Sequence, residues 1–366
     1  MPPTATPSAF YWEVMTLPLE FAFTIAYGSQ AVSRTVRVAL SACPNIQPNT
    51  PPANNLITGW GEAVPSLFYG AETAESVCEF YQQLQADGFW QQHNLWNRQA
   101  IECALSAYPG HLAAKAGISI ALYDWAGKAL NLPLYALLGL DPKNTPKTCY
   151  TIGISSLAEV EHKTQLALTR GYDILKVKLG GENDRESLAL IRRLAPGITL
   201  RADANAGWPA PIALERCKML ADFGVEFVEE PLTLDSPPAA YETLKATSPV
   251  LLMADESCHQ LTDIPRCAEW FHAVNLKHTK TGSLTQIIQM IHAAKAHQLK
   301  VMLGGFAESS ISVTAMAHLS PLVDYADLDA CLLLAHDPYQ GVCFEGSQIL
   351  LPSAPGLGVT TRPKDA

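Results

Sequence analysis

Five ionisable residues recur through the second half of the chain at an almost constant spacing, and this spacing constrains the fold most. Each closes or follows a short apolar segment that predicts a β-strand, and each interval has the length of one compact strand–helix unit. Equal spacing at strand ends predicts that the five side chains lie at one level of a repeated β/α structure. They are separated by 25, 26, 26 and 25 residues and are, in order, Lys178, Asp203, Glu229, Asp255 and Lys280.

Eight short apolar segments alternate with longer helical stretches from about residue 147 onward. This alternation predicts parallel βαβ units, and eight such units in about 180 residues fit a (β/α) barrel. The active site of such a barrel lies at the carboxyl ends of its strands, where the five ionisable residues fall. The predicted strands are 148–154, 174–178, 198–203, 225–229, 251–255, 273–277, 300–305 and 323–329.

The first part of the chain predicts a separate α+β domain. Residues 11–16 and 34–40 alternate between apolar and polar side chains, as strands do, and a Pro- and Asn-rich loop follows at 41–58. Three helical stretches come next, and the last of them is apolar on most of its surface, which predicts a largely buried helix. These stretches are about 71–86, 96–108 and 111–130.

The two parts divide an α/β chain into two expected domains. Pro142 and Pro146 mark the boundary between them. The last residues are expected to return to the first domain as a short hairpin or tail. The expected domains are an N-terminal α+β domain over 1–145, completed by the C-terminal tail 341–366, and a barrel over 146–340.

Composition and charge exclude several classes of function. Lys+Arg 25 against Asp+Glu 35 gives a net charge of −10, and no basic cluster offers the phosphate contacts of a nucleic-acid-binding protein. No uncharged apolar run approaches the roughly 18 residues of a membrane span, and the first ten residues do not read as a signal peptide. Nine widely spaced cysteines without a Cys-x-x-Cys pair are typical of reduced thiols. We expect a cytoplasmic protein that binds neither nucleic acid nor membrane.

Three carboxylates side by side in a confined barrel mouth would repel one another unless a cation bound them. The all-oxygen set of Asp203, Glu229 and Asp255 favours Mg²⁺ or a similar hard ion. The cation would disfavour the ammonium forms of the flanking Lys178 and Lys280 and so lower their pKa toward a value useful for proton transfer. This arrangement suits removal of an α-proton from a carboxylate substrate and its return from the opposite face, which inverts the carbon.

At these residues the sequence resembles the enolase superfamily, in its muconate-lactonizing-enzyme subgroup, over nearly the whole chain. The superfamily uses a Lys or His base together with Mg²⁺. The resemblance implies a modified (β/α)7β TIM-like barrel with an N-terminal α+β capping domain. The motifs that carry it are Lys176-Val177-Lys178, Asp203-Ala204-Asn205, Glu229-Glu230-Pro231, Asp255-Glu256-Ser257 and Asn275–Gly282 in the barrel, and Gly61–Pro65 and Ala121–Lys128 in the first domain.

The resemblance also implies a role for each matching residue. Lys178 and Lys280 form the acid/base pair, and Lys176 neutralises the substrate carboxylate beside one Mg²⁺ per subunit. Lys277, in the same segment as Lys280, is assigned no catalytic role, because a structural ion pair explains it equally well. The metal ligands and the residues that orient them are, respectively, Asp203, Glu229 and Asp255, and Asn205 and Glu230.

Asp327 and Asp329, at the eighth predicted strand, indicate which reaction of the subgroup the chain performs. Residues two apart on a strand face the same side, so the two carboxylates would hold an ammonium group together. The pair is similar to the element with which dipeptide epimerases bind the substrate α-amino group. It implies inversion of the C-terminal residue of an L,L-dipeptide through a metal-stabilised enolate. Glu308, after the seventh strand, resembles a rim position that binds substrate or supports a lysine.

Loops of the first domain are expected to set the preference for substrate side chains. The segments 21–29 and 65–70 contribute Tyr27 and Phe68 as candidate substrate contacts. The first segment lacks the Arg with which Ala-Glu epimerases pair an acidic side chain, and its aromatic residues favour an apolar one. Because Glu20 leaves a cationic side chain open, we expect a hydrophobic or cationic side chain rather than Glu.

Other activities on the same scaffold stay open at this point. An o-succinylbenzoate synthase or muconate cycloisomerase would use the same metal site without need of Asp327 and Asp329. An N-acylamino acid racemase also acts on a substrate without a free amine. A non-enzymatic metal-binding barrel would need the ligands but not the paired lysines. The expected partner is a small dipeptide, and the oligomeric state, including a homo-oligomer, is left open.

Overall fold

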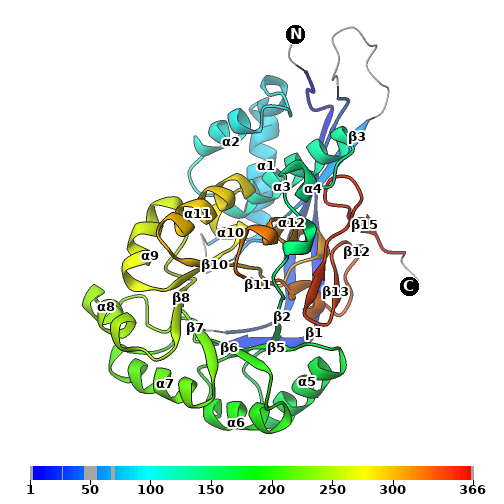
Figure 1. Ribbon diagram of the computed structural model, residues 1–366. Helices are drawn as coiled ribbons and strands as arrows, with labels where there is room; N and C mark the ends of the chain where they lie inside the picture. The colour runs from blue at the N-terminus through cyan, green and yellow to red at the C-terminus, as the bar shows by residue number, and fades with distance from the viewer. Residues whose placement is uncertain (1–2, 27, 45–55, 67–70, 364–366) are drawn as a thin grey trace.

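The polypeptide forms an antiparallel sheet covered by helices and, after it, a parallel barrel (Figure 1). The structure is a computed structural model, and it describes residues 3–26, 28–44, 56–66 and 71–363. The two parts correspond to the α+β domain and the barrel that the sequence predicts. The barrel provides the strand ends on which the ionisable residues lie, and the sheet closes over one side of them.

The first part is built on a long hairpin. Its strands exceed the predicted ranges at both ends, and alternate residues such as Val36, Val38 and Leu40 are fully buried. The three predicted helices form. Two of them, α1 and α3, pack against this apolar face, and α2 packs against α3. The elements are β1 (Ala9–Ile25), β2 (Gly28–Ala42), β3 (Ile57–Ala63), α1 (Ala74–Ala86), η1 (Phe89–Gln92), α2 (Arg98–Ser106), α3 (Leu112–Leu130), α4 (Leu134–Leu137) and η2 (Pro142–Asn144).

Helix α3 is the buried helix that the sequence predicts, and it lies against β3 with almost no space between the two backbones. Of its 19 residues, 14 are buried. A Cβ atom added at Gly61 would lie 2.0 Å from the carbonyl oxygen of Gly117, and one at Gly59 would lie 2.1 Å from that of Ala121. Only glycine at these strand positions permits this approach, because any side chain would meet rigid backbone.

Eight parallel strands follow in sequential order, each paired with the next along the chain. A bridge between Thr148 and Ala326 brings the first strand beside the last, so that the sheet curves into a nearly closed barrel. This confirms the predicted barrel. The strands are β4 (Tyr150–Ile152), β5 (Ile174–Lys178), β6 (Thr199–Asp203), β7 (Val225–Glu229), β8 (Leu251–Ala254), β9 (Ala273–Leu276), β10 (Lys300–Gly304) and β11 (Tyr325–Asp327).

A helix follows every barrel strand except the last, where a short 3-10 turn, η5 (Ala330–Leu333), takes its place. This pattern confirms the modified (β/α)7β barrel. Figure 1 shows these helices on the outer side of the strands. They are α5 (Leu157–Thr169), α6 (Asp184–Leu194), α7 (Ala210–Asp222), α8 (Pro238–Thr247), η3 (Leu261–Asp263) with α9 (Ile264–Trp270), α10 (His278–Thr281) with α11 (Leu284–Ala296), and α12 (Ser310–Leu319) with η4 (Ser320–Leu322).

The barrel interior changes from apolar to charged along its axis. A small buried apolar cluster lies inside the barrel, on the amino-terminal side of the carboxylates. It consists of Phe227, Met253, Ala273 and Met302. Since alternate residues of a strand face the same side, the next inward position on each strand lies one layer higher, toward the carboxyl ends. On β7 and β8 these next positions are the carboxylates that the sequence singles out. The apolar layer therefore forms a dry floor beneath them.

The hairpin of the first part reaches across to the mouth of the barrel (Figure 1). The pairing of β1 with β2 shifts register between Pro18 and Phe23, and this irregularity lets the end of the hairpin bend away from the sheet. The amide of Ile154, just after β4, donates to the carbonyl of Thr24 at 3.0 Å. The end of the hairpin is thereby attached above the strand ends.

The C-terminal segment contacts both parts of the chain. The amide of Leu357 donates to Asp124 of α3 at 2.7 Å. The carbonyl of Ser347 accepts the amide of Thr148, just before the first barrel strand, at 2.8 Å. The segment thus joins the two parts along one side. Its strands are β12 (Tyr339–Gln340), β13 (Cys343–Glu345), β14 (Gln348–Leu350) and β15 (Thr360–Thr361).

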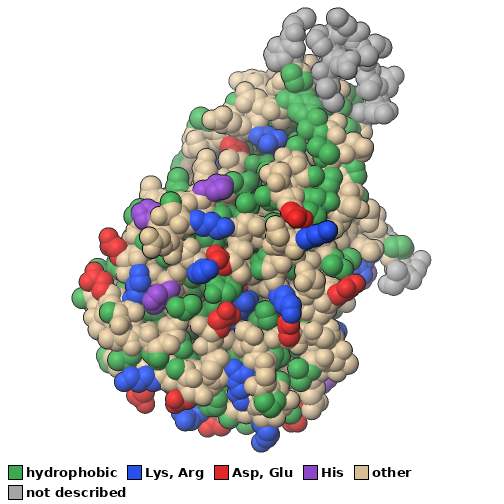
Figure 2. Space-filling view, viewed as in Figure 1, with side chains coloured by type: hydrophobic (Ala, Val, Ile, Leu, Met, Phe, Trp, Pro, Cys, Tyr) green, Lys and Arg blue, Asp and Glu red, His purple; other side chains and the backbone are tan. Residues whose placement is uncertain are grey.

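Charged side chains of both signs share the surface, and the cysteines are dispersed through the fold. Figure 2 shows acidic and basic side chains interspersed over the lower half of the visible face. None of the helices in the described ranges is both long enough and apolar enough to span a bilayer. All nine cysteines are unpaired, and five of them are buried.

Substituting Gly61 by Ala should destabilise the protein. The added methyl group would force β3 and α3 apart, and overpacking of this kind costs about 1–3 kcal/mol. Gly197→Ala is the matched control, because nothing lies within 4 Å of its added Cβ. Urea denaturation measures both variants. Equal free energies of unfolding for the two variants would contradict the close approach.

Candidate active site

The carboxyl ends of four neighbouring strands bring the first members of the spaced series together. Lys178 of β5 pairs in register with Asp203 of β6, and Asp203 pairs in turn with Glu229 of β7. Asp255 follows directly after β8. The regular spacing therefore places these four residues at one level of the barrel, as predicted.

The three carboxylates form one compact cluster. Asp203, Glu229 and Asp255 are all fully buried, and one oxygen atom from each lies within 4.8 Å of the other two. An all-oxygen set of three acidic groups is what a hard divalent cation such as Mg²⁺ prefers. Without a compensating cation, three buried carboxylates would repel one another strongly. The residues present therefore fit a single metal ion.

Lysine ammonium groups surround this cluster. The Nζ atom of Lys176 lies 2.6 Å from Glu229 Oε2 and 3.1 Å from Asp203 Oδ2, and Lys178 Nζ lies 2.5 Å from the same Asp203 oxygen. Burial would raise the pKa of Asp203, but the two lysines overcome this and lower it. Glu229 is less well compensated, and burial together with the charge of Asp203 raises its pKa to about 8.

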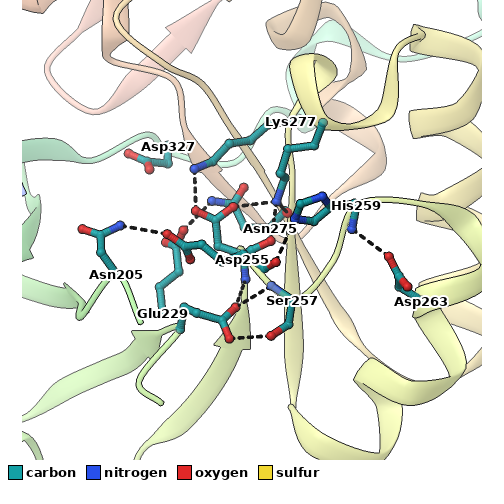
Figure 3. Close-up of polar contacts among 12 residues, drawn as sticks. Asn205, Glu229, Asp255, Ser257, His259, Asp263, Asn275, Lys277 and Asp327 are labelled. Atoms are coloured by element: carbon teal, nitrogen blue, oxygen red, sulfur yellow. Dashed lines mark hydrogen bonds and ion pairs between the residues drawn. The ribbon is translucent and has the colours of Figure 1, made fainter. Parts of the chain in front are cut away.

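Lys277, and not Lys280, is the lysine that reaches the cavity from the end of β9. Lys277 Nζ lies 2.5 Å from Asp255 Oδ2, and the side chain lines the cavity above the carboxylates (Figure 3). Lys280 Nζ instead donates to Asp255 Oδ1 at 2.6 Å, to the carbonyl of Asp255 at 2.7 Å and to that of Asn275 at 2.9 Å. Lys280 is 1% exposed and is not among the described residues that line the cavity. This geometry does not fit the acid/base role expected for Lys280.

The strand-end position after β9 falls on Lys277, because the unit that follows Asp255 is shorter than its neighbours. Its helical part, η3 and α9 over residues 261–270, is as long as α8, but the loop before it, 256–260, is shorter than the loop 230–237 before α8. Equal spacing therefore extends past the end of this strand and predicts Lys280, which lies in α10.

Asn275 is a site residue to which the sequence analysis gave no role. Its side-chain Nδ2 donates to Glu229 Oε1 at 2.7 Å, and its backbone carbonyl accepts from Lys280. Figure 3 shows Asn275 beside Asp255 and Lys277. Its position on β9, two residues before Lys277, is the signal that could have identified it, since both face the barrel interior.

Asn205 and Glu230 lie directly behind the ligands. The backbone amide of Asn205 donates to Asp203 Oδ1 at 2.9 Å, and the Asn205 side chain also lines the cavity. Glu230 accepts the backbone amide of Asp255 at 2.8 Å and the amide and hydroxyl of Ser257 at 2.9 and 2.6 Å. Asn205 thus holds the carboxylate of Asp203, and Glu230 holds the backbone that carries Asp255.

Asp327 and Asp329 face the cavity together at the end of β11. Asp327 Oδ2 lies 2.6 Å from Lys176 Nζ, and Asp329 accepts the backbone amide of Thr151 at 2.6 Å and its hydroxyl at 3.2 Å. Burial opposes ionisation of Asp327, but Lys176 outweighs it and lowers the pKa. Burial and the charge of Asp327 raise the pKa of Asp329 to about 7. The pair is a site for a positive group above the carboxylate cluster.

A cavity of about 250 Å³ lies between the strand ends and the hairpin. Its charged residues all belong to the lysine and carboxylate groups already described, and the others are uncharged. The described residues that line it are Phe23, Ile25, Gly28, Ser29, Gln30, Ser66, Thr151, Lys176, Lys178, Asn205, Lys277, Gly305, Phe306, Ala307, Asp327, Asp329, Ala330 and Leu333.

Three of the expected substrate contacts do not appear in this lining. Tyr27 and Phe68 lie outside the described residues. Glu308 is fully buried behind the cavity wall, where its Oε1 would lie 2.6 Å from a Cβ atom added at Gly305. Direct contact between Glu308 and a substrate does not fit this position.

The barrel, its capping sheet and the buried carboxylate cluster define an enolase-like protein. The family model described as "Enolase C-terminal domain-like" matches residues 159–366, and that of the "Mandelate racemase / muconate lactonizing enzyme, N-terminal domain" matches residues 54–139. The chain belongs to this mandelate racemase and muconate lactonizing enzyme family of enolase-like proteins.

Similar proteins carry the names of epimerases. The chain is 38% identical over 310 residues to an L-Ala-D/L-amino acid epimerase of Pedosphaera parvula, covering 84% of this chain and 88% of that protein. It is 33% identical over 345 residues to an L-Ala-D/L-Glu epimerase of Bacteroides thetaiotaomicron, covering 94% and 85%. A solved dipeptide epimerase of Enterococcus faecalis, complexed with Mg and the dipeptide L-Leu-L-Tyr, has a TM-score of 0.86 at 28% identity and covers 97% and 99%.

Mg²⁺ should stabilise the folded protein, because the carboxylate cluster exists only in the folded state. At a free concentration 100 times the Kd, the free energy of unfolding should rise by about 2.7 kcal/mol. Glu229→Gln should lose most of this increment. Glu226→Gln, on the same strand but paired with Arg201 instead, should keep it. Urea denaturation with and without Mg²⁺ measures the effect, and an unchanged increment in Glu229→Gln would contradict the metal site.

Proposed function

We propose that the chain is a Mg²⁺-dependent dipeptide epimerase that inverts the α-carbon of the C-terminal residue by two-base proton transfer between Lys178 and Lys277. One observation carries the proposal. Two lysine amines reach a single cavity from β5 and β9, which lie on opposite sides of the eight-stranded barrel, and a carboxylate pair faces the same cavity.

The lysines would act in sequence on the two faces of one carbon. One of them, as the neutral amine, takes the α-proton, and the electron pair of the broken C–H bond moves into the adjacent carboxylate. The other, as the ammonium ion, returns a proton from the opposite face. The protonation states of Lys178 and Lys277 are then exchanged, and the reverse reaction restores them.

The carboxylate of the substrate must be neutralised for this proton to leave. Asp203, Glu229 and Asp255 would hold Mg²⁺, which polarises a bound carboxylate and stabilises the charge that develops on it. Lys176 lies among the same oxygens and would place a further positive charge beside the substrate. Lys280 and Asn275 would keep Asp255 and Glu229 in position.

The α-ammonium group of a dipeptide accounts for the two carboxylates opposite the cluster. Asp327 and Asp329 would bind it, and Thr151 holds Asp329 through two hydrogen bonds. A cycloisomerase, an o-succinylbenzoate synthase or an N-acylamino acid racemase acts on a substrate without this positive group. With such a substrate, no positive group of the substrate would face this buried carboxylate pair.

The described lining of the cavity favours uncharged substrate side chains. Apart from the lysines and aspartates above, it consists of apolar residues such as Phe23, Ile25, Phe306 and Leu333 and of uncharged polar ones such as Gln30. A charged side chain would lose water there without gaining a partner of opposite sign. The hydrophobic alternative of the sequence analysis is therefore better supported than the cationic one.

Turnover of dipeptides in D₂O tests the proposal. L-Ala-L-Leu should gain one deuterium at the α-carbon of its C-terminal residue, with a kcat/KM about tenfold or more above those of L-Ala-L-Glu and L-Ala-L-Lys. Mass spectrometry measures the label and chiral chromatography the inversion. Absence of exchange from every dipeptide, with exchange from an N-acylated amino acid, would overturn it.

Alanine variants of the two lysines test which face of the substrate α-carbon each lysine serves. Lys178→Ala and Lys277→Ala should each lose inversion by about 10³-fold, while each still exchanges the α-proton of one epimer, and not the same one. Lys300→Ala, which removes an exposed lysine from the opposite end of β10, should behave like the wild type. Exchange restricted to one epimer in Lys280→Ala, with normal inversion in Lys277→Ala, would assign the second base to Lys280.

The preference for a free amine should grow as the pH rises through about 7. The raised pKa of Asp329, about 7, means that its carboxyl group is largely protonated at pH 6 and ionised above pH 7, and only the ionised form adds to ammonium binding. Between about pH 6 and 7.5, below the amine pKa of about 8, the KM of an N-acetylated dipeptide divided by that of the free dipeptide should rise about fivefold. Asp329→Asn should make this ratio independent of pH.

A further inference from the structure

Three ionisable residues are buried together behind one wall of the cavity. Glu62 comes from β3 of the capping sheet, His278 from α10 and Glu308 from the segment after β10, and each is fully buried. The epimerase mechanism uses none of them directly. A buried acid without a counter-ion is costly, so its protonation state must be determined by its surroundings.

Glu62 has the surroundings of an ionised carboxylate. It accepts the backbone amide of Ser309 at 3.2 Å, the Ser309 hydroxyl at 2.7 Å and the backbone amide of Ser312 at 3.3 Å. These donors belong to the N-terminal turn of α12, which favours negative charge. Glu62 therefore caps a barrel helix from the capping domain. Burial raises the pKa of Glu62, but these donors oppose the rise, so Glu62 holds a negative charge more readily than Glu308 does.

Glu308 has none of these donors, although it lies next to Glu62 in the same buried cluster. Its Oε2 is 3.5 Å from the Nε2 atom of His278, and the amide of Phe306 faces its carboxyl group. Burial lowers the pKa of His278 to about 3, so the ring is neutral and offers no compensating charge. Burial, and then the charge of Glu62, raise the pKa of Glu308 well above its usual value, and Lys277 opposes this only in part. Cys331, on the remaining side, is a protonated thiol, because burial raises its pKa.

The carboxyl group of Glu308 supports the part of the wall that lies closest to Lys277. It lies against the backbone of Gly305, and the segment from Gly305 to Ala307 lines the cavity. The hydroxyl of Ser33, from the capping sheet, donates to the carbonyl of Ala307 at 2.5 Å. The ring of Phe306 lies 5.0 Å from Lys277 Nζ. Glu308 and Ser33 thus hold the segment from two sides, and Lys277 packs on its Phe306 ring.

We propose that Glu308 is a positioning residue, present as the neutral carboxylic acid, that holds the Gly305–Ala307 segment and through it Lys277. The neutral form matters because an ionised Glu308 would attract the ammonium group of Lys277 and disfavour its deprotonation. The proposal rests on the proposed function only where activity is measured.

Infrared spectroscopy tests the protonation state without any substrate. The difference spectrum between the wild type and Glu308→Gln at pH 8 should contain the C=O stretching band of a protonated carboxylic acid. Glu102→Gln is the matched control. Glu102 is a partly buried glutamate of α2 outside this cluster, and it accepts hydrogen bonds from the hydroxyl groups of Ser119 and Thr285. A difference spectrum that contains only carboxylate bands for Glu308 would overturn the proposal.

Kinetics test the positioning role. Glu308→Ala should lower kcat by about 100-fold with little change in KM, because a displaced base slows proton transfer more than binding. Glu308→Gln, which keeps the shape and the neutral charge, should recover most of this loss and keep the pH profile of kcat. Loss of activity in Glu308→Gln equal to that in Glu308→Ala would show that the ionised form is needed, and an active Glu308→Ala would remove the positioning role.

A second variant covers the case in which Glu308→Ala does not fold. Gly305→Ala leaves Glu308 in place but directs a methyl group at its Oε1 atom, so it should lower kcat in the same way. Wild-type activity in Gly305→Ala would contradict the proposal. If the wild type exchanged no dipeptide proton at all, the proposed function would fail, while the infrared result would still decide the state of Glu308.

Discussion

The repulsion among three buried carboxylates is the constraint on which the rest of the site depends. Asp203, Glu229 and Asp255 lie within one coordination sphere on an apolar floor, where charges are poorly screened. Each is paired with a lysine: Asp203 with Lys178 of the neighbouring strand, Glu229 with Lys176 two strands away, and Asp255 with Lys280 of α10. The cluster therefore favours binding of a small divalent cation. The lysines that partly neutralise the carboxylates include those that the proposed proton transfer needs.

The capping sheet contributes to the site by closing it and by holding the wall segment. The hairpin brings Phe23 and Ile25 over the strand ends and so makes a cavity from what would otherwise be an open rim. On the other side, Glu62 and Ser33 attach the sheet to α12 and to Ala307. The close contact of β3 with α3 fixes the strand that carries Glu62. Packing in the capping domain is thus transmitted to one wall of the barrel cavity.

The fold and most of the site could be predicted from the sequence because both follow from local periodicity. Strand-end residues separated by one βα unit must lie at one level, and this holds for Lys178, Asp203, Glu229 and Asp255. The spacing does not predict Lys277, because the loop after Asp255 is short, and loop length cannot be read from the spacing of polar residues alone. It fails for Glu308 because side-chain direction after β10 depends on which residues fill the space behind Gly305. The spacing of residues predicts the level of each Cα atom along the barrel axis. Whether a side chain enters the cavity or lies behind its wall is decided by tertiary packing.

Metal binding and base activation are linked through shared partners. In the structure, Lys178 is paired with Asp203 and Lys277 with Asp255. Burial would lower the pKa of Lys277, but the charge of Asp255 outweighs this and raises it. With a divalent cation among the same oxygens, both lysines would lose part of this attraction and experience a positive neighbour instead. The pKa of Lys277, which Asp255 raises, would then fall. An ionised Glu308 beside Lys277 would oppose this fall on one face only and make the two bases unequal, whereas a neutral Glu308 leaves them matched for a reaction that must run in both directions.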